Sequence, residues 1–182
     1  MEGNIFIDPE RCLACKSCEL ACAVEHSQSK VLFQAIFEEP RPQPLVKVEL
    51  VREAPIALER LTSPLQCRHC EDAPCIAVCP TRALEKRGIE GPVLVHEELC
   101  IGCKWCVLVC PFGVIGLRRD GKAIIKCDLC FEREGEPACV EACPTKALRF
   151  MTVAEFGRER RRKALAELQR GLVLGKEQRL WR

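Results

Sequence analysis

Hydrophobic side chains lie in short runs along the 182-residue chain. No run approaches the roughly 18 apolar residues that a membrane helix needs. Residues 4–7 are apolar and are followed by Asp8-Pro9, which predicts a short strand that ends there. Apolar and charged residues alternate over 45–51, the clearest strand pattern in the chain. The apolar residues 92–95 predict one strand of a hairpin. The hydrophobic pattern therefore predicts a fold built from short strands.

A second hairpin is expected further along the chain. Its strands cover residues 114–118 and 123–126, and Asp120-Gly121 provides the tight turn between them. A short helix is expected over residues 19–25, and the polar residues 26–30 after it are expected to form a loop.

The C-terminal part carries the pattern of a longer helix. Thr152 and Glu155 have the spacing of a capping box, in which the side chain of each residue accepts from the backbone N–H of the other. The helix is expected to run to about Arg170, with Gly171 as its C-terminal stop. Residues 179–182, at the end of the chain, are expected to lie along the surface or along a partner.

Cysteine supplies the strongest chemical signal. In residues 100–111, three cysteines follow one another at steps of three, a fourth comes four residues later, and a proline follows it. This is the ligand run of a bacterial 4Fe–4S ferredoxin, in which the fourth cysteine of a run ligates the other cluster. The run reads Cys100-Ile-Gly-Cys103-Lys-Trp-Cys106-Val-Leu-Val-Cys110-Pro111.

The same run recurs three more times, and together the four runs use all sixteen cysteines of the chain. One copy keeps the spacing, and the other two lengthen the second gap. The repeat continues beyond the ligands, because residues 79–84 (Cys-Pro-Thr-Arg-Ala-Leu) match residues 143–148 (Cys-Pro-Thr-Lys-Ala-Leu). Four runs imply four 4Fe–4S clusters. The three further runs are Cys12, Cys15, Cys18 and Cys22; Cys67, Cys70, Cys75 and Cys79; and Cys127, Cys130, Cys139 and Cys143.

Two other uses of sixteen cysteines are disfavoured. A disulfide framework is typical of short secreted chains with a signal peptide, and the sequence begins Met-Glu-Gly-Asn-Ile-Phe, without the basic and apolar regions of such a peptide. Structural zinc takes its ligands as two separated pairs, so a third cysteine three residues after a pair is superfluous.

Composition and charge agree with buried clusters. The chain has 7 Phe, 2 Trp and no Tyr, so its conventional core is thin and the clusters are expected to replace part of it. The formal charge is +2 with neutral cysteines. Four clusters at about −2 each would bring the protein to roughly −6, which argues against a nucleic-acid partner. So many reduced sulfurs indicate a reducing cytoplasm. No phosphate-binding or nucleophile motif is present.

Two ring-bearing side chains lie inside ligand runs. His69, between Cys67 and Cys70, could be a ligand or a proton relay, but a surface imidazole hydrogen-bonded near a cluster is favoured. Trp105 could carry electrons, but an aromatic lid that excludes water is favoured.

Basic residues raise a similar choice. Lys16, Arg68, Lys104 and Lys126 lie in or beside ligand runs and could raise cluster potentials, dock a partner or be ordinary solvated charges. The basic run at residues 158–163 is interpreted as a solvated helix face, with docking to an anionic membrane or partner as the alternative.

Four runs with these gaps resemble those of the four-cluster ferredoxin-like electron-transfer subunits of molybdopterin oxidoreductases, formate dehydrogenases, hydrogenases and carbon monoxide dehydrogenase systems. The resemblance extends from about residue 4 to residue 150. Residues 12–27 (Cys-Leu-Ala-Cys-Lys-Ser-Cys-Glu-Leu-Ala-Cys-Ala-Val-Glu-His-Ser) look most like the ferredoxin partner of carbon monoxide dehydrogenase. Similar subunits accompany tungsten aldehyde oxidoreductases. Some relatives carry a twin-arginine leader or a C-terminal membrane helix. Neither feature is expected in this chain, and a cytoplasmic location is expected.

The resemblance implies an α+β fold of two pseudo-twofold-related, bacterial-ferredoxin-like modules, each with two clusters, short strands and short helices. One module is expected from about residues 1–30 and 124–150, and the other from about 60–123. Residues 151–182 are expected to add a C-terminal helix and tail.

The resemblance also implies how the cysteines pair, because the first run shares its clusters with the fourth and the second with the third. The four ligand sets implied are Cys12, Cys15, Cys18 and Cys143; Cys67, Cys70, Cys75 and Cys110; Cys100, Cys103, Cys106 and Cys79; and Cys127, Cys130, Cys139 and Cys22.

The expected function is a one-electron relay between a larger catalytic redox subunit and a second electron carrier. Carbon monoxide dehydrogenase is the first expected partner, and a formate-, hydrogen- or aldehyde-oxidising enzyme is the alternative. A catalytic role is disfavoured because complete thiolate sets leave no iron open for substrate. A structural or sensing role is disfavoured because four clusters exceed what either needs.

Overall fold

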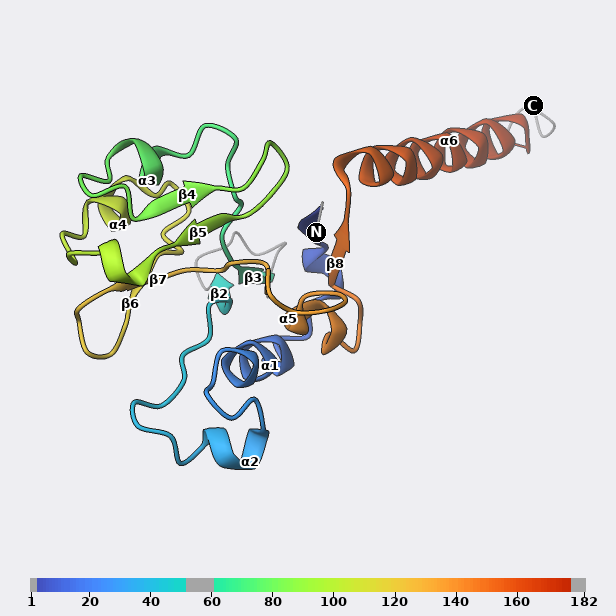
Figure 1. Cartoon of the computed structure of the whole chain (residues 1–182). Coiled ribbons are helices and arrows are strands. Elements are labelled where there is room, and N and C mark those ends of the chain that lie inside the picture. Colours follow the sequence, from blue (N-terminus) through green and yellow to red (C-terminus); the bar gives the residue numbers. More distant parts are fainter. Residues whose placement is uncertain (1–2, 52–60, 178–182) are drawn as a thin grey trace. The chain divides into compact units, whose positions relative to one another are not determined.

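The structure, a computed structural model, describes residues 3–51 and 61–177 (Figure 1). The chain divides into one unit over residues 1–150 and a second over residues 151–182. The expected tail at residues 179–182 lies outside the described residues. Within them, no helix is both long enough and apolar enough to cross a membrane.

The described elements are short except for the last helix, and together they make a mixed α+β fold. The strands are β1 Asn4–Ile7, β2 Lys47–Val51, β3 Leu61–Leu65, β4 Leu84–Lys86, β5 Val93–Val95, β6 Gly116–Leu117, β7 Ile124–Ile125 and β8 Leu148–Met151. The helices are α1 Ser17–Glu25, α2 Leu32–Ala35, α3 Pro74–Ala77, α4 Trp105–Val109, α5 Ala138–Glu141 and α6 Val153–Glu177, with 3₁₀ turns at η1 Pro9–Arg11 and η3 Glu97–Leu99.

The described strands pair two by two. β1 pairs with β8, while β2 with β3, β4 with β5, and β6 with β7 form antiparallel pairs. The Asp8 amide also donates to the Ala147 carbonyl at 2.8 Å. The β1–β8 pair therefore brings the first cysteine run beside the end of the fourth.

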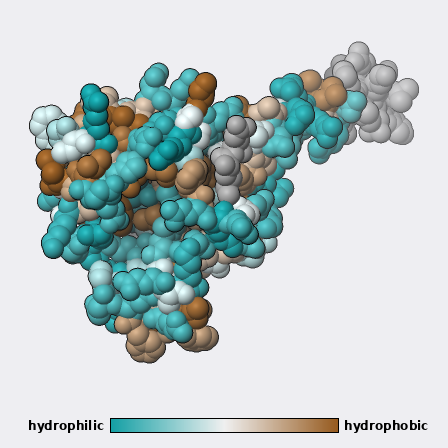
Figure 2. Space-filling model, viewed as in Figure 1, coloured by the Kyte–Doolittle hydropathy of each residue, from teal (hydrophilic) through white to brown (hydrophobic). Residues whose placement is uncertain are grey.

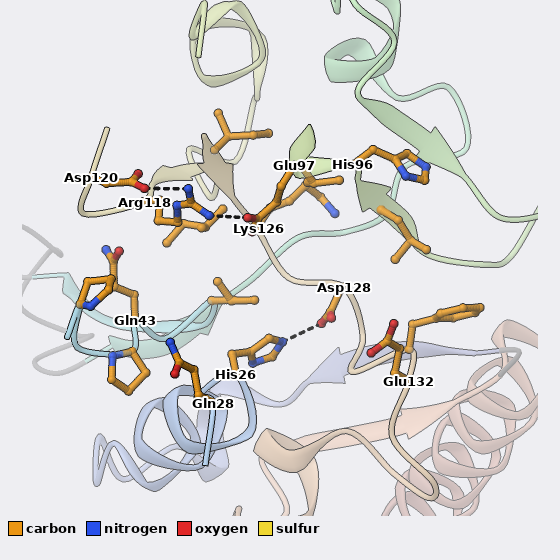
Figure 3. Close-up of a pocket in the computed structure, with 18 of the residues that line it drawn as sticks. His26, Gln28, Gln43, His96, Glu97, Arg118, Asp120, Lys126, Asp128 and Glu132 are labelled. Carbon is orange, nitrogen blue, oxygen red and sulfur yellow. Dashed lines mark hydrogen bonds and ion pairs between the residues drawn. The ribbon is translucent and has the colours of Figure 1, made fainter. Parts of the chain in front are cut away.

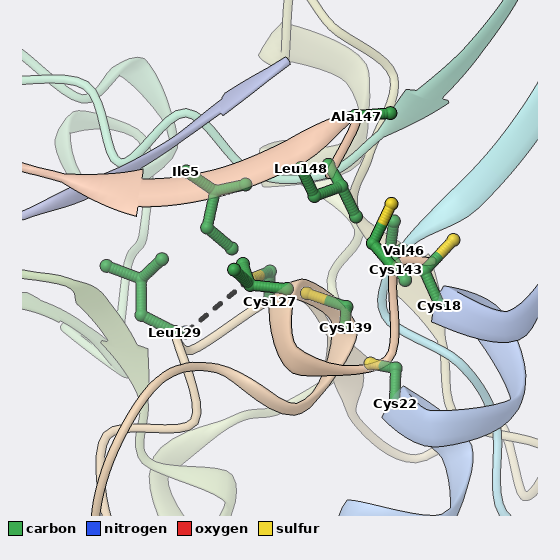
Figure 4. Packing of buried hydrophobic residues seen from close by; sticks show 11 residues of the cluster. Ile5, Cys18, Cys22, Val46, Cys127, Leu129, Cys139, Cys143, Ala147 and Leu148 are labelled. Atoms are coloured by element: carbon green, nitrogen blue, oxygen red, sulfur yellow. Dashed lines mark hydrogen bonds between the residues drawn. The ribbon is translucent and has the colours of Figure 1, made fainter. Parts of the chain in front are cut away.

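The short helices also associate in two pairs. α1 packs against α5, and α3 packs against α4. Buried residues form two clusters, one around Ile5, Val46 and Leu148 and the other around Leu84 and Val93. Figure 4 shows the first cluster, in which cysteine side chains from α1 and α5 are part of the packing. Both clusters contain cysteines, so the space around these thiols is part of the core.

Several elements confirm the sequence patterns. β1, β2 and β5 lie within the expected stretches, and α1 covers the expected helix with two further residues at its start. The capping box is formed: the Thr152 amide donates to Glu155 Oε2 at 2.9 Å, and the Glu155 amide donates to Thr152 Oγ1 at 3.2 Å. Gly121 has φ +70°, as the expected turn requires, and its amide donates to the Arg118 carbonyl.

Other expectations need correction. The strands of the second hairpin are shorter than predicted, because only β6 and β7 keep ladder geometry. The prediction that Gly171 stops the last helix is wrong, since α6 continues to Glu177. A single glycine costs a helix about 1 kcal/mol, which is too little to end a 25-residue helix by itself. The sequence patterns also missed α2 and β3.

Candidate metal centres

Three small cavities in the first unit are each lined by four cysteines. Every one of them combines three cysteines of one run with the last cysteine of another. We call the three groups the first, second and third sets. The first set is Cys12, Cys15, Cys18 and Cys143; the second is Cys67, Cys70, Cys75 and Cys110; the third is Cys79, Cys100, Cys103 and Cys106.

The remaining four cysteines, which we call the fourth set, are Cys22, Cys127, Cys130 and Cys139, and all of them are buried. Burial raises the pKa of the Cys139 thiol, and the nearby Cys22 and Cys130 thiols raise it further. Figure 4 shows how α1 serves two sets: the sulfur of Cys18 lies beside Cys143, whereas the sulfur of Cys22 faces Cys139.

A shared backbone turn shapes the start of every run. The second residue between the first two cysteines has positive φ in all four runs, at Ala14 (+54°), His69 (+48°), Gly102 (+66°) and Leu129 (+62°). Turns that include left-handed residues direct successive N–H groups into a concave surface that favours an anion. At Gly102 a side chain is also excluded, because a Cβ there would lie 2.9 Å from the Lys122 carbonyl oxygen.

Backbone amides donate to the cysteine sulfurs. The His69 amide lies 3.4 Å from Cys67 Sγ, and the Leu129 amide lies at the same distance from Cys127 Sγ. The Leu45 amide lies 3.3 Å from Cys22 Sγ. Such N–H···S bonds stabilise negative charge on sulfur and tune the potential of a cluster held there.

Burial also sets the protonation of the thiols. It raises the pKa of the Cys18 and Cys106 thiols to about 11, and it raises that of Cys127 as well. Cys15 is the opposite case, because hydrogen bonds with Ser17 lower its pKa. The Cys18, Cys106 and Cys127 thiols are therefore protonated without metal, and metal binding must release their protons.

Two polar side chains at the start of the second run are buried. Both side-chain polar atoms of Gln66 and the Nε2 atom of His69 are buried without a hydrogen-bond partner in the described part of the chain. Nδ1 of His69 accepts from the Val93 amide at 2.9 Å, so Nε2 carries the proton of the neutral ring. The donor sets themselves give the chemical match, because three separate cavities are each lined by four cysteines, as a 4Fe–4S cluster requires.

The structure corrects the favoured interpretation of His69. This side chain is only 4% exposed, so it is not a surface imidazole, although it is hydrogen-bonded inside a ligand run as expected. Burial, followed by the positive charges of Lys126 and Lys86, lowers its pKa to about 3. Trp105 is 59% exposed, and its role as an aromatic lid stays a prediction.

The four basic residues of the ligand runs separate into two groups. Lys16, Arg68 and Lys104 are exposed, which agrees with solvated charge. Lys126 is only 3% exposed and is not solvated. On α6, the basic side chains at 158 and 160–163 are all exposed, as expected for a solvated helix face.

An ion pair beside the fourth set was missed by sequence reasoning. His26 Nε2 lies 3.0 Å from Asp128 Oδ1 (Figure 3). His26 Nδ1 lies 2.7 Å from the Cys22 carbonyl oxygen. Burial opposes protonation of His26, but the Asp128 carboxylate and then the Cys22 sulfur outweigh it and raise the pKa of His26 to about 11. The two residues line a cavity of about 780 Å³ that also reaches Arg118. Their separation of 102 positions left no local signal.

Comparison with known proteins identifies the family. The profile described as "4Fe-4S dicluster domain" matches residues 58–153. An "Iron-sulfur protein" of Rhodospirillum rubrum is 40% identical and is aligned over 91% of this chain and 92% of its own length. The "Putative electron transport protein YsaA" of Escherichia coli is also 40% identical, over 89% of this chain and 98% of its own.

A third relative is a chain of a named oxidoreductase. It is one of the polypeptides of the anaerobic dimethyl sulfoxide reductase of Escherichia coli, 37% identical over 84% of this chain and 75% of its own length. The matched profile spans more than half of the chain, and the relatives align with most of it. Sixteen cysteines in four runs provide ligands for four 4Fe–4S clusters. The chain therefore belongs to the 4Fe-4S dicluster domain family of ferredoxin-like iron–sulfur proteins.

Proposed function

We propose that this chain is an electron-transfer subunit that relays single electrons between a catalytic redox subunit and a second carrier. The carrying observation is that twelve of the sixteen cysteines line three cavities, four to each, while the other four are all buried in the same unit. Electron-transport names among the relatives support the same role.

The four sets are the proposed ligand groups, one cluster to each set. This is the pairing implied by the family resemblance, and the three cysteine-lined cavities support it directly. When bound, each cluster supplies a one-electron redox centre whose irons are all coordinated by thiolate. Two modules follow from the pairing, one with the first and fourth sets and the other with the second and third; the two buried clusters support this division.

The protein's own residues exclude water and orient charge around the sets. The fourth set is buried throughout, while Cys15 of the first set and Cys103 of the third are exposed. Electrons can enter and leave a protein efficiently only through centres near its surface. We therefore assign the partner-facing ends of the relay to the first and third sets, and the interior steps to the second and fourth.

Apolar side chains around the third set support docking there. Ile101, Trp105 and Leu108 are all more than half exposed. In Figure 2, hydrophobic residues gather over the face where Figure 1 shows α3 and α4. Exposed apolar patches of this kind are typical of protein interfaces.

The proposed partner is carbon monoxide dehydrogenase, because residues 12–27 resemble its ferredoxin partner most closely. A formate-, hydrogen- or aldehyde-oxidising enzyme is the alternative. The proposed location is a reducing cytoplasm, in which free thiols and clusters of this number are stable.

The test begins with the anaerobically purified chain alone, assayed with an artificial dye against carbon monoxide, formate, hydrogen and aldehydes. We expect no turnover, since sixteen cysteines supply a complete thiolate set for each of four clusters and leave no iron open for substrate. Adding each purified enzyme with its substrate should then bleach the visible absorbance of the chain, with the true partner fastest. Reproducible turnover by the lone chain, or no bleaching by any enzyme, would contradict the relay.

A further inference from the structure

Lys126 is a buried cation between two ligand runs. It follows β7 and precedes Cys127, and its side chain is 3% exposed. Its Nζ donates to the Cys127 carbonyl at 2.6 Å and also to the Val93 carbonyl. Cys127 belongs to the fourth set, whereas Val93 lies in β5. The ammonium group therefore links the backbone of β5 to the backbone at the start of the fourth run.

Val93 also forms a hydrogen bond to a residue of the second run. The Val93 amide donates to Nδ1 of His69, which lies between Cys67 and Cys70. His69 is held from a further side, because Lys86 Nζ donates to its carbonyl at 2.5 Å. A continuous chain of hydrogen bonds therefore runs from the second set, through Val93 and Lys126, to the fourth set.

The charge of Lys126 has no carboxylate partner among the described residues. Asp128 is near in sequence, but its carboxylate accepts a hydrogen bond from His26 Nε2 (Figure 3). The same carboxylate accepts one from the Cys130 amide at 2.9 Å. A buried ammonium group is costly unless negative charge lies close to it. Thiolate-bound clusters in the second and fourth sets would provide that charge.

We propose that Lys126 is a positioning residue that raises the reduction potentials of the clusters held by the second and fourth sets. This proposal rests on the proposed function only in assuming that both sets hold clusters. A fixed positive charge stabilises the more negative, reduced state, and it does so more strongly in a buried site than in water. Because the same ammonium group contacts both loops, it favours an electron on either of the two interior centres over the two partner-facing ones.

The test compares midpoint potentials of the full holo chain, measured by redox titration with EPR detection. Lys126→Met keeps the length of the side chain and removes its charge, whereas Lys126→Arg keeps the charge. Lys122→Met makes the same charge change at an exposed position on the β6–β7 turn, and its hydrogen bond to Asp120 uses the backbone amide and is retained.

With Lys126→Met, two of the four midpoints should fall, each by at least the tenfold shift in the one-electron equilibrium that corresponds to about 59 mV. Lys126→Arg should stay closer to the unmodified chain, and Lys122→Met should leave those two midpoints unchanged. Four unchanged midpoints with Lys126→Met, or an equal shift of all four, would overturn the proposal.

If Lys126→Met does not load its full iron, Lys126→Arg decides the question. If Lys126→Arg carries its full iron and its midpoints match those of the unmodified chain, the positive charge is what the sets require. If Lys126→Arg loads incompletely, or if two of its midpoints fall, the proposal is overturned. The titrations use chemical mediators on the isolated chain. A failure of the relay itself would appear only with partner enzymes, so the two failures are distinguishable.

Discussion

Cys18 and Cys22 are one helical turn apart on α1, yet their thiols join different sets. Cys18 lines the cavity of the first set together with Cys143. The sulfur of Cys22 accepts a hydrogen bond from the Leu45 amide and faces Cys139. The two side chains leave the helix in different directions, so each thiol lies in its own set. Single substitutions can therefore separate the sets.

We predict that Cys22→Ser removes one cluster, the one proposed for the fourth set, and leaves the first set loaded. Serine oxygen is a poorer ligand for iron than thiolate, and the site is buried. Iron analysis with EPR of the holo chain measures the loss. The matched control is Cys18→Ser on the same helix, which should remove the cluster of the first set. If both variants lost the same EPR signal, the assignment of Cys22 to the fourth set would be wrong.

At the scale of elements, α6 is defined by its N-terminal cap. Thr152 and Glu155 exchange hydrogen bonds, and the Thr152 hydroxyl also donates to Glu155 Oε2 at 3.0 Å. Hydrogen bonds from the Thr152 backbone and then from its side chain lower the pKa of Glu155. Capping of this kind satisfies amides that would otherwise lack partners in the first turn.

We predict that Thr152→Ala frays the first turn of α6. Backbone amides 153–156 should exchange with solvent several-fold faster, because an alanine side chain cannot accept the hydrogen bond from the Glu155 amide. Hydrogen–deuterium exchange measures this, and Thr152→Ser, which keeps the hydroxyl, is the control. Unchanged exchange in the alanine variant would show that the box does not stabilise the turn.

The same cap should depend on pH. The pKa of Glu155 is lower in the folded state than its ordinary value, so its stabilisation is fully present above the ordinary pKa. The stabilisation is lost as pH falls through the folded pKa, when the carboxylate is protonated. Protection of amides 153–156 should therefore decrease in acid, and it should decrease less in Glu155→Gln, which has no proton to gain.

At the scale of the whole chain, cysteine side chains take the place of conventional core residues. The cluster around Ile5 includes five buried cysteines, Cys18, Cys22, Cys127, Cys139 and Cys143, and large aromatic side chains are absent from its buried members in the described chain. Without clusters, the first unit would enclose thiols whose pKa values are raised by burial, with little other apolar area to hold them together. Folding and cluster binding should therefore be coupled.

We predict that anaerobically purified protein is brown and carries about sixteen iron and sixteen sulfide per chain. Removing iron with acid or a chelator should unfold most of the first unit, measured as lost near-UV circular dichroism and lost amide protection. Helix α6 is a matched internal control, because its hydrogen bonds are within the helix and should be less affected. A colourless zinc protein, or an apo chain with native protection, would contradict this prediction.

The sequence alone determined the chemistry of the sites and many local elements. Cysteine spacing is a covalent property of the chain, so the four runs and their preference for 4Fe–4S clusters could be recognised directly. The strand at β2, the turn at Asp120-Gly121 and the capping box at Thr152 depend on neighbouring residues and were predicted correctly. The end of α6 was not, because a single glycine is a weak local signal.

Burial and long-range contact were decided by the tertiary structure. Lys126 and His69 looked like the other polar residues of the ligand runs, but folding places Val93 against both and removes them from solvent. The pair of His26 and Asp128 joins positions 102 residues apart. A charge in the sequence has the same value wherever it lies, whereas its effect depends on the dielectric and the partners that the fold provides.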